Sequence, residues 1–186
     1  WRRTVLDYID SDALAAAATT TDVAILDHAV PFADGVMLFS AQRQLSLTNG
    51  DSGLSAHSLS IQPVTRYVMA PGVRPAPLGS QVHFITDSGG FSSVQEYTRL
   101  TGADPTEAAD ITAHVPGLIP SGASQIIPVP DLDALFVLTR SAADGERNRL
   151  YAYQFFWDGE KKVISAWRVW DFDDGEPVSG AYLSGA

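Results

Sequence analysis

Short apolar runs that alternate with polar residues, paired across short polar or Gly-containing turns, constrain the fold of this chain more than any other feature. Residues 81–86 and 93–98 form one such pair, and the segment Asp87-Ser88-Gly89-Gly90 between them has the composition of a hairpin turn. The same arrangement occurs at 36–40 with 44–48, and at 134–139 with 150–156. This pattern predicts antiparallel hairpins rather than amphipathic helices.

The hairpins recur at a regular spacing. Their first strands end on a hydroxyl residue at Ser40, Thr86 and Thr139, which are 46 and 53 residues apart. Periods of about 40 to 50 residues with several short strands each are typical of β-propeller blades. Flanking runs complete each hairpin, which predicts three meanders with strands at 23–29, 36–40, 44–48 and 58–61, then 66–70, 81–86, 93–98 and 111–115, then 125–129, 134–139, 150–157 and 163–170.

We therefore predict an all-β fold of repeated four-stranded antiparallel meanders that forms part of a β-propeller-like platform. A β-sandwich with irregular loops is the alternative. The expected organisation is a lead-in segment at 1–21, a β-rich region of about three blades at 22–172 and the start of a further strand or tail at 173–186. Three blades leave open edges, and the chain begins at Trp1 rather than Met, so we expect it to be part of a larger protein.

One segment conflicts with the strand pattern. Residues 12–18 contain four consecutive alanines, which favour a helix intrinsically, and Ser11 or Asp12 would serve as its N-cap. Because propensity is readily overridden by tertiary contacts, we expect a short or absent helix there.

Charge and cysteine content exclude several kinds of protein. The 186 residues carry 22 acidic and 12 basic side chains, and this net charge of -10 argues against a sequence-independent nucleic-acid binder. The same charge suits a conduit through which DNA slides without adhering, although solubility alone also explains it. With no cysteine, the chain has neither disulfides nor a thiolate metal site, and no stretch approaches the roughly 20 apolar residues of a membrane helix.

The histidines and acidic residues do not form a recognisable chemical site. Asp27 and His28 are adjacent, so on a strand they point to opposite faces, and no nucleophile accompanies them. His57 and His83 lack the spacing of metal ligands, and His114 lies in a stiff segment before Pro116. We assign no catalytic, cofactor-binding or metal-binding residue.

Two possibilities involving carboxylates stay open. The acidic cluster Asp171, Asp173, Asp174 and Glu176 loosely resembles a calcium loop but lacks its ligand order, and we interpret it as a solvated turn. Whether Asp171, Asp173 and Glu176 bind an ion is not decided by the sequence. A carboxylate pair suited to glycoside cleavage is also compatible with the chain, because separation in space is invisible here.

Aromatic residues are the better candidates for structural or interface roles. Trp157 leads into a turn, while Trp167 and Trp170 differ by three positions, so on a regular strand they face opposite sides. We expect one of them to be buried between blades and the other to be available for a subunit contact, with a core role for both as the alternative. The structural or interface candidates are His114, Pro116, Trp157, Trp167 and Trp170.

A series of short motifs, led by the run Asp110–Pro116 and the downstream Trp167 to Trp170, resembles the tail tubular protein B family, the nozzle proteins of short-tailed bacteriophages. The matching segments, in the order of the family, are 29–32, 38–40, 58–61, 74–75, 78–79, 94–97, 109–120 and 162–167. The chain departs from the family pattern at Ser11–Leu14 and after Asp171.

The resemblance implies a non-enzymatic virion protein. Its members are expected to form a hexameric ring at the end of the phage tail tube, to contact the tail adaptor protein and the tail fibre protein, and to let DNA pass during ejection without binding it specifically. An acidic lumen would keep the phosphate backbone from adhering. Two other classes remain: a cellular interaction propeller, and a propeller that binds or cleaves glycans.

Overall fold

The computed structural model describes residues 25–32, 35–48, 60–98, 108–140, 148–159, 161–172, 175, 177 and 179–183. Apart from one 3-10 turn at Pro130–Leu132, the regular elements in these ranges are all β-strands. The predicted all-β class is therefore confirmed. The lead-in segment 1–21 with its alanine run lies outside the described residues.

Two of the three sheets are four-stranded antiparallel meanders, as the hairpin pattern predicts. The first sheet has the order β1 (Leu26–Phe32), β2 (Gly35–Ser40), β3 (Arg43–Thr48) and β4 (Ser60–Thr65). The third has the order β10 (Ala123–Val129), β11 (Ala134–Thr139), β12 (Arg149–Asp158) and β13 (Lys161–Asp171). The strands predicted at 23–29 and 58–61 are found two to four residues further along the chain, at Leu26–Phe32 and Ser60–Thr65.

The second sheet is less regular. Its order is β5 (Ala76–Leu78), β6 (Gln81–Ser88), β7 (Phe91–Thr98) and β8 (Ala109–Asp110), and β9 (Ile119–Pro120) also pairs with β7. The central hairpin turns at Gly89 and Gly90, whose φ angles of 62° and 89° are left-handed conformations that glycine adopts without steric cost.

The predicted strand at 66–70 is wrong, because the segment divides its backbone bonds between the first two sheets. It contacts β6 through an isolated bridge from Met69 to Thr86 and through the amide of Ala70, which donates to the carbonyl of Ile85 (2.8 Å). The amide of Met69 donates to the carbonyl of Ala41 (2.9 Å), and both backbone polar groups of Tyr67 bond to the side chain of Gln44. The segment 66–70 therefore joins two sheets. The sheet edge where a strand at 66–70 was predicted is occupied by β5 instead.

The predicted strand at 111–115 is also wrong, and a compact turn replaces it. A carboxylate oxygen of Asp110 accepts a hydrogen bond from the amide of Thr112 (2.8 Å), and the Thr112 hydroxyl accepts from the amide of Val94 (3.3 Å). These side chains take backbone partners that a strand would use, so pairing with β7 stops after two residues.

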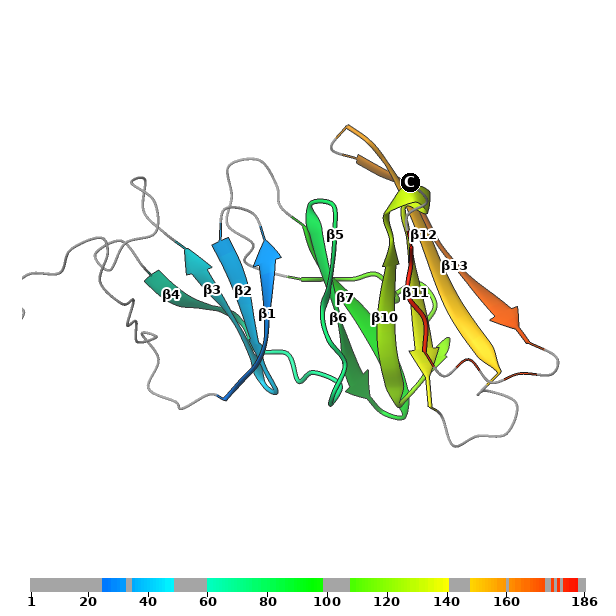
Figure 1. Ribbon diagram of the computed structural model, residues 1–186, viewed down its shortest axis with the longest axis horizontal. Coiled ribbons are helices and arrows are strands. Elements are labelled where there is room, and N and C mark those ends of the chain that lie inside the picture. Colours follow the sequence, from blue (N-terminus) through cyan, green and yellow to red (C-terminus); the bar gives the residue numbers. More distant parts are fainter. Residues whose placement is uncertain are drawn as a thin grey trace, which may run out of the picture.

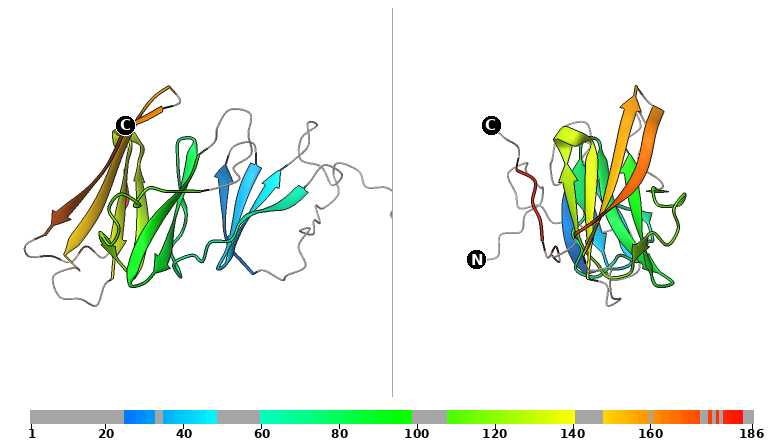
Figure 2. Two further views of the ribbon diagram at one scale, coloured as in Figure 1. Left: turned by 180° about the vertical axis from the view of Figure 1, so that it is seen from behind. Right: turned by 90° about the vertical axis from the view of Figure 1, so that its right-hand side faces the viewer.

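The three sheets lie side by side along the long axis of the molecule (Figure 1), and β5 contacts both β1 and β10. One apolar cluster joins the first and second sheets and includes Phe39, Phe84 and Tyr97. A larger one joins the second and third sheets and includes Ile85, Tyr151 and Tyr153. The end-on view in Figure 2 shows the sheets overlapping along this axis. The described strands form three successively packed sheets rather than a two-layered sandwich, while closure into a propeller-like platform stays a prediction.

Candidate functional site: the seam between the second and third sheets

The side chains on one face of β12 lie in the contact between the second and third sheets. Tyr151, Tyr153 and Phe155 alternate along this strand and are all buried in the cluster shared with β6 and β7. Tyr153 stacks on Phe155 with ring centroids 5.7 Å apart, and its ring is tilted against that of Trp167 of β13 at 4.9 Å. We call this contact region the seam.

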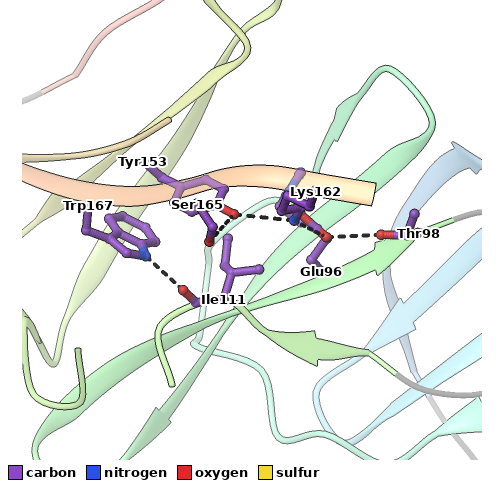
Figure 3. A network of polar contacts seen from close by, with 8 residues as sticks. Glu96, Thr98, Ile111, Tyr153, Lys162, Ser165 and Trp167 are labelled. Atoms are coloured by element: carbon purple, nitrogen blue, oxygen red, sulfur yellow. Dashed lines mark hydrogen bonds and ion pairs between the residues drawn. The ribbon is translucent and has the colours of Figure 1, made fainter. Parts of the chain in front are cut away.

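A buried ion pair crosses the seam. Lys162 of β13 donates through Nζ to both carboxylate oxygens of Glu96 on β7, at 2.6 and 2.7 Å (Figure 3). The carboxylate also accepts from His83 Nε2 (3.0 Å) on β6 and from the Thr98 hydroxyl (3.0 Å). Glu96 is 3% exposed and His83 is 0% exposed, so this is a charged cluster inside the protein rather than on its surface.

The partners of Glu96 keep it ionised despite burial. Desolvation by itself raises the pKa of this carboxyl, but the hydrogen bonds and charges supplied by His83 and Lys162 outweigh it and lower the pKa to about 2. An ionised carboxylate only accepts hydrogen bonds, so His83 donates through Nε2. His83 Nδ1 finds no hydrogen-bond partner within the described structure.

Aromatic rings complete the surroundings of the lysine. The ammonium of Lys162 lies 5.1 Å from the ring centre of Trp157, 5.6 Å from that of Phe155 and 5.7 Å from that of Tyr153. It also donates to the Tyr153 hydroxyl (3.3 Å), which in turn bonds Ser165 at 3.0 Å. The charge is therefore held by one carboxylate and by ring faces that attract cations.

Trp167 connects the two most distinctive parts of the sequence. Its indole nitrogen donates to the carbonyl of Ile111 (2.9 Å), inside the run Asp110–Pro116 (Figure 3). Trp157 contacts the second sheet as well: Gln81, with its amide oriented to satisfy both neighbours, accepts from the Trp157 indole (2.7 Å) and donates to the Leu78 carbonyl (3.2 Å). Both indoles thus tie the third sheet to the second.

The other candidates from the sequence lie away from the seam. Trp170 is on the opposite face of β13, 47% exposed, with its ring centre 5.2 Å from that of Phe136. His114 and Pro116 are exposed in the turn that follows β8. The structure therefore brings Trp157 and Trp167 together at the seam, and leaves His114, Pro116 and Trp170 outside it.

Sequence reasoning missed the residues that carry the charge. Glu96 appeared only within a family motif, and His83 was set aside for lacking a metal-ligand spacing. On a regular strand Lys162 and Trp167 would face opposite sides, but the bulge opposite Trp157 places them on the same face of β13. That bulge is not visible in the sequence, so the position of Lys162 was not predictable.

A second polar contact joins the first and second sheets. The amide of Gln44, which is 0% exposed, donates to the Tyr67 carbonyl (3.1 Å) and accepts from the Tyr67 amide (3.0 Å) and the Thr65 hydroxyl (2.8 Å). Thr65 also bonds the hydroxyl of Tyr97 on β7, whose pKa is raised by burial. Each junction between sheets thus combines an apolar cluster with hydrogen-bonded polar side chains.

Among the described residues, no group of three or more His, Asp or Glu side chains could hold a metal ion. Two cavities of about 330 and 220 Å³ are lined by described residues, and neither lining includes a carboxylate. Asp171 pairs with Arg149 (2.8 Å), while Asp173, Asp174 and Glu176 lie outside the described residues. Within the described part of the chain, no helix is long and apolar enough to cross a membrane.

Comparison with known proteins gives one family and one curated relative. The family described as bacteriophage nozzle protein matches residues 1–185. The tail tubular protein gp12 of Escherichia phage T7 is 28% identical over 170 residues, which cover 91% of this chain and 21% of the T7 protein. The chain thus spans about a fifth of the length of that relative.

Proposed function

Because this chain belongs to the bacteriophage nozzle protein family, we propose that it forms part of the wall of a phage tail tube through which DNA leaves the particle. Its role is mechanical rather than catalytic. The observation that carries the proposal is the way the sheets are joined: each junction holds a buried apolar cluster and a fully buried polar side chain with its partners. Such joints suit a wall that must keep its shape.

The assembly that we propose is a hexameric ring that closes a β-propeller-like platform. The T7 relative is named a tail tubular protein, and a closed ring of identical copies is the simplest way to build a tube from one kind of chain. The ring would contact the tail adaptor protein above and the tail fibre protein at its side.

The net charge of the chain supports the passage of DNA without binding. The net charge of -10 would repel the phosphate backbone, so that DNA slides along the lumen rather than adhering to it. Part of the excess of acidic side chains is placed on the channel face in this proposal. A map of the ring with a basic lumen would contradict it.

Imaging of the full-length product tests the assembly directly. We expect six-fold rings in negative stain and the same rings at the tail ends of purified particles. Isolated particles in solution, with the protein missing from tails, would overturn the proposal. Release of sugar from bacterial surface polysaccharide, lost when one carboxylate is replaced by alanine without unfolding, would favour a glycan-cleaving protein instead.

A further inference from the structure

One short segment after β13 returns to the third sheet without joining it. Residues 179–183 have no regular secondary structure and pair with no described strand. They lie against the face of β10 and β11 that is turned away from the seam, which we call the outer face. There Tyr182 packs on the buried cluster of Ile127, Leu138 and Leu150. We call residues 179–183 the strap, which is the red coil that crosses the third sheet in Figure 1.

Side chains make every hydrogen bond between the strap and the described part of the sheet. The side-chain amide of Gln125 on β10 holds Gly180 through both of its atoms: Nε2 donates to the Gly180 carbonyl (2.8 Å), and Oε1 accepts from the Gly180 amide (3.1 Å). The Tyr182 hydroxyl donates to a carboxylate oxygen of Asp131. The strap is therefore attached at two points, and neither uses the backbone of β10.

The sheet beneath the strap is complete without it. Strand β10 pairs with β11 from Ala123 to Val129, and β11 pairs with β12. Detachment of the strap would break none of these backbone hydrogen bonds, whereas it would uncover apolar side chains that are now buried, Leu138 above all at 2% exposed. A segment held in this way can open locally while the core beneath it stays folded.

Packing beneath the strap is uneven. A cavity of about 220 Å³ lies between the strap and the outer face, and its lining includes Leu138, Leu150 and Tyr182. Atoms that border a void lack contact partners on one side and lose dispersion energy. At Gly180 the fit is close instead, because a Cβ there would lie 2.7 Å from Cδ1 of Ile127. The strap is thus fitted tightly where Gln125 holds it and loosely beside that point.

We propose that the strap opens and closes over the outer face while the third sheet stays folded, and that the side-chain amide of Gln125 is the contact that holds it closed. Opening breaks the three side-chain hydrogen bonds and exposes an apolar surface, and closing buries that surface again. The strap therefore controls access to the outer face of β10 and β11. The inference goes beyond the proposed role in the tail wall and does not depend on it.

Thiol labelling of the full-length protein under native conditions tests the opening. Leu138→Cys places a thiol under the strap, and Val137→Cys places one on the opposite face of β11, in the seam. Iodoacetamide modification at each position is followed by mass spectrometry of the peptide that contains it. We expect labelling at position 138 to be at least tenfold faster than at position 137, because only the strap has to move. An equal or slower rate at position 138, or no labelling at either, would overturn the proposal.

Gln125→Ala tests whether this side chain holds the strap closed. It removes both bonds to Gly180 and should raise the labelling rate at position 138 at least fivefold, with position 137 unchanged. Gln154→Ala is the matched control, because Gln154 is exposed on the neighbouring strand β12, and it should change neither rate. An unchanged rate at position 138 in Gln125→Ala would contradict the proposal. A rise of the same size at position 137 would equally overturn it, because Gln125 would then support the whole sheet rather than the strap.

Discussion

Lys162 occupies an unusual place, because an edge strand directs a charged side chain into the protein. Its ammonium is 16% exposed and meets a carboxylate that is 3% exposed. Inward-pointing charges of this kind discourage wrong pairing of a sheet edge, and a buried pair can also fix how two elements fit together. The pair therefore joins β13 of the third sheet to β7 of the second.

Replacement of Lys162 alone should be costly. Lys162→Met leaves the carboxylate of Glu96 buried with one fewer charged donor, and breaking a buried pair in this way costs about 3 kcal/mol. Lys161→Met is the matched control, because the neighbouring side chain is exposed and should change the free energy of unfolding by less than about 0.5 kcal/mol. Urea unfolding measures both, and equal effects would show that the ion pair contributes nothing.

The low pKa of Glu96 predicts a specific dependence of stability on pH. The folded carboxyl has a pKa of about 2, against 4.5 ordinarily, so its contribution is fully present above pH 4.5 and is lost as the pH falls toward 2. The free energy of unfolding of wild type should exceed that of Glu96→Gln by about 3 kcal/mol at neutral pH. This difference should shrink between pH 4.5 and 2, and a constant difference would contradict the assignment.

At the scale of elements, the turn after β8 depends on one side chain. Asp110 accepts from the amide and the hydroxyl of Thr112, which orients Thr112 toward Val94 and leaves the Ile111 carbonyl to Trp167. Asp110→Ala should cost about 1 kcal/mol, whereas Asp110→Asn, which retains the acceptor, should cost less than half of that. Urea titration of both variants is the measurement, and an equal loss in both would point to charge rather than to the turn.

The sequence predicted the elements that depend on local alternation and missed those that depend on neighbours. The hairpin at Gly89 and Gly90 and both complete meanders follow from alternating residues and turn chemistry. The segments 66–70 and 111–115 read equally well as strands, but side chains of Gln44, Asp110 and Thr112 take their backbone partners. Gln44 is 23 residues from Tyr67, and Thr112 is 18 residues from Val94, so no local pattern could reveal these two contacts.

The candidate site divides in the same way. Trp167 and Trp170 were placed on opposite sides of a strand from their spacing, and the structure has them on opposite faces of β13. The interface role of Trp170 stays a prediction. His83 and Glu96 are paired positions on the neighbouring strands β6 and β7, and Lys162 reaches them only when the third sheet packs against the second. The complete cluster is therefore a property of the packed sheets rather than of any motif.

At the scale of the whole molecule, the two junctions should make the described sheets unfold as one unit. Apolar clusters continue from the first sheet to the second and from the second to the third, so loss of one sheet exposes the core of its neighbour. A wall of separate sheets would instead melt in steps. The positions of the tryptophans allow the two cases to be distinguished.

Gln44→Ala in a Trp1→Phe background tests this cooperativity from the far end of the molecule. The substitution leaves the part-buried backbone groups of Tyr67 without their side-chain partner and should cost about 2 kcal/mol, whereas Gln62→Ala, on an exposed position of the same sheet, should cost less than about 0.5 kcal/mol. Trp157, Trp167 and Trp170 all report on the third sheet, while far-UV circular dichroism reports on every strand.

If the sheets unfold together, Gln44→Ala lowers the urea midpoint seen by tryptophan fluorescence as much as the midpoint seen by circular dichroism. The reason is that destabilising the first sheet then also destabilises the third. A fluorescence midpoint that stays at the wild-type value while the dichroism transition splits would mean that the sheets are independent, and a rigid wall would then require contacts from neighbouring subunits.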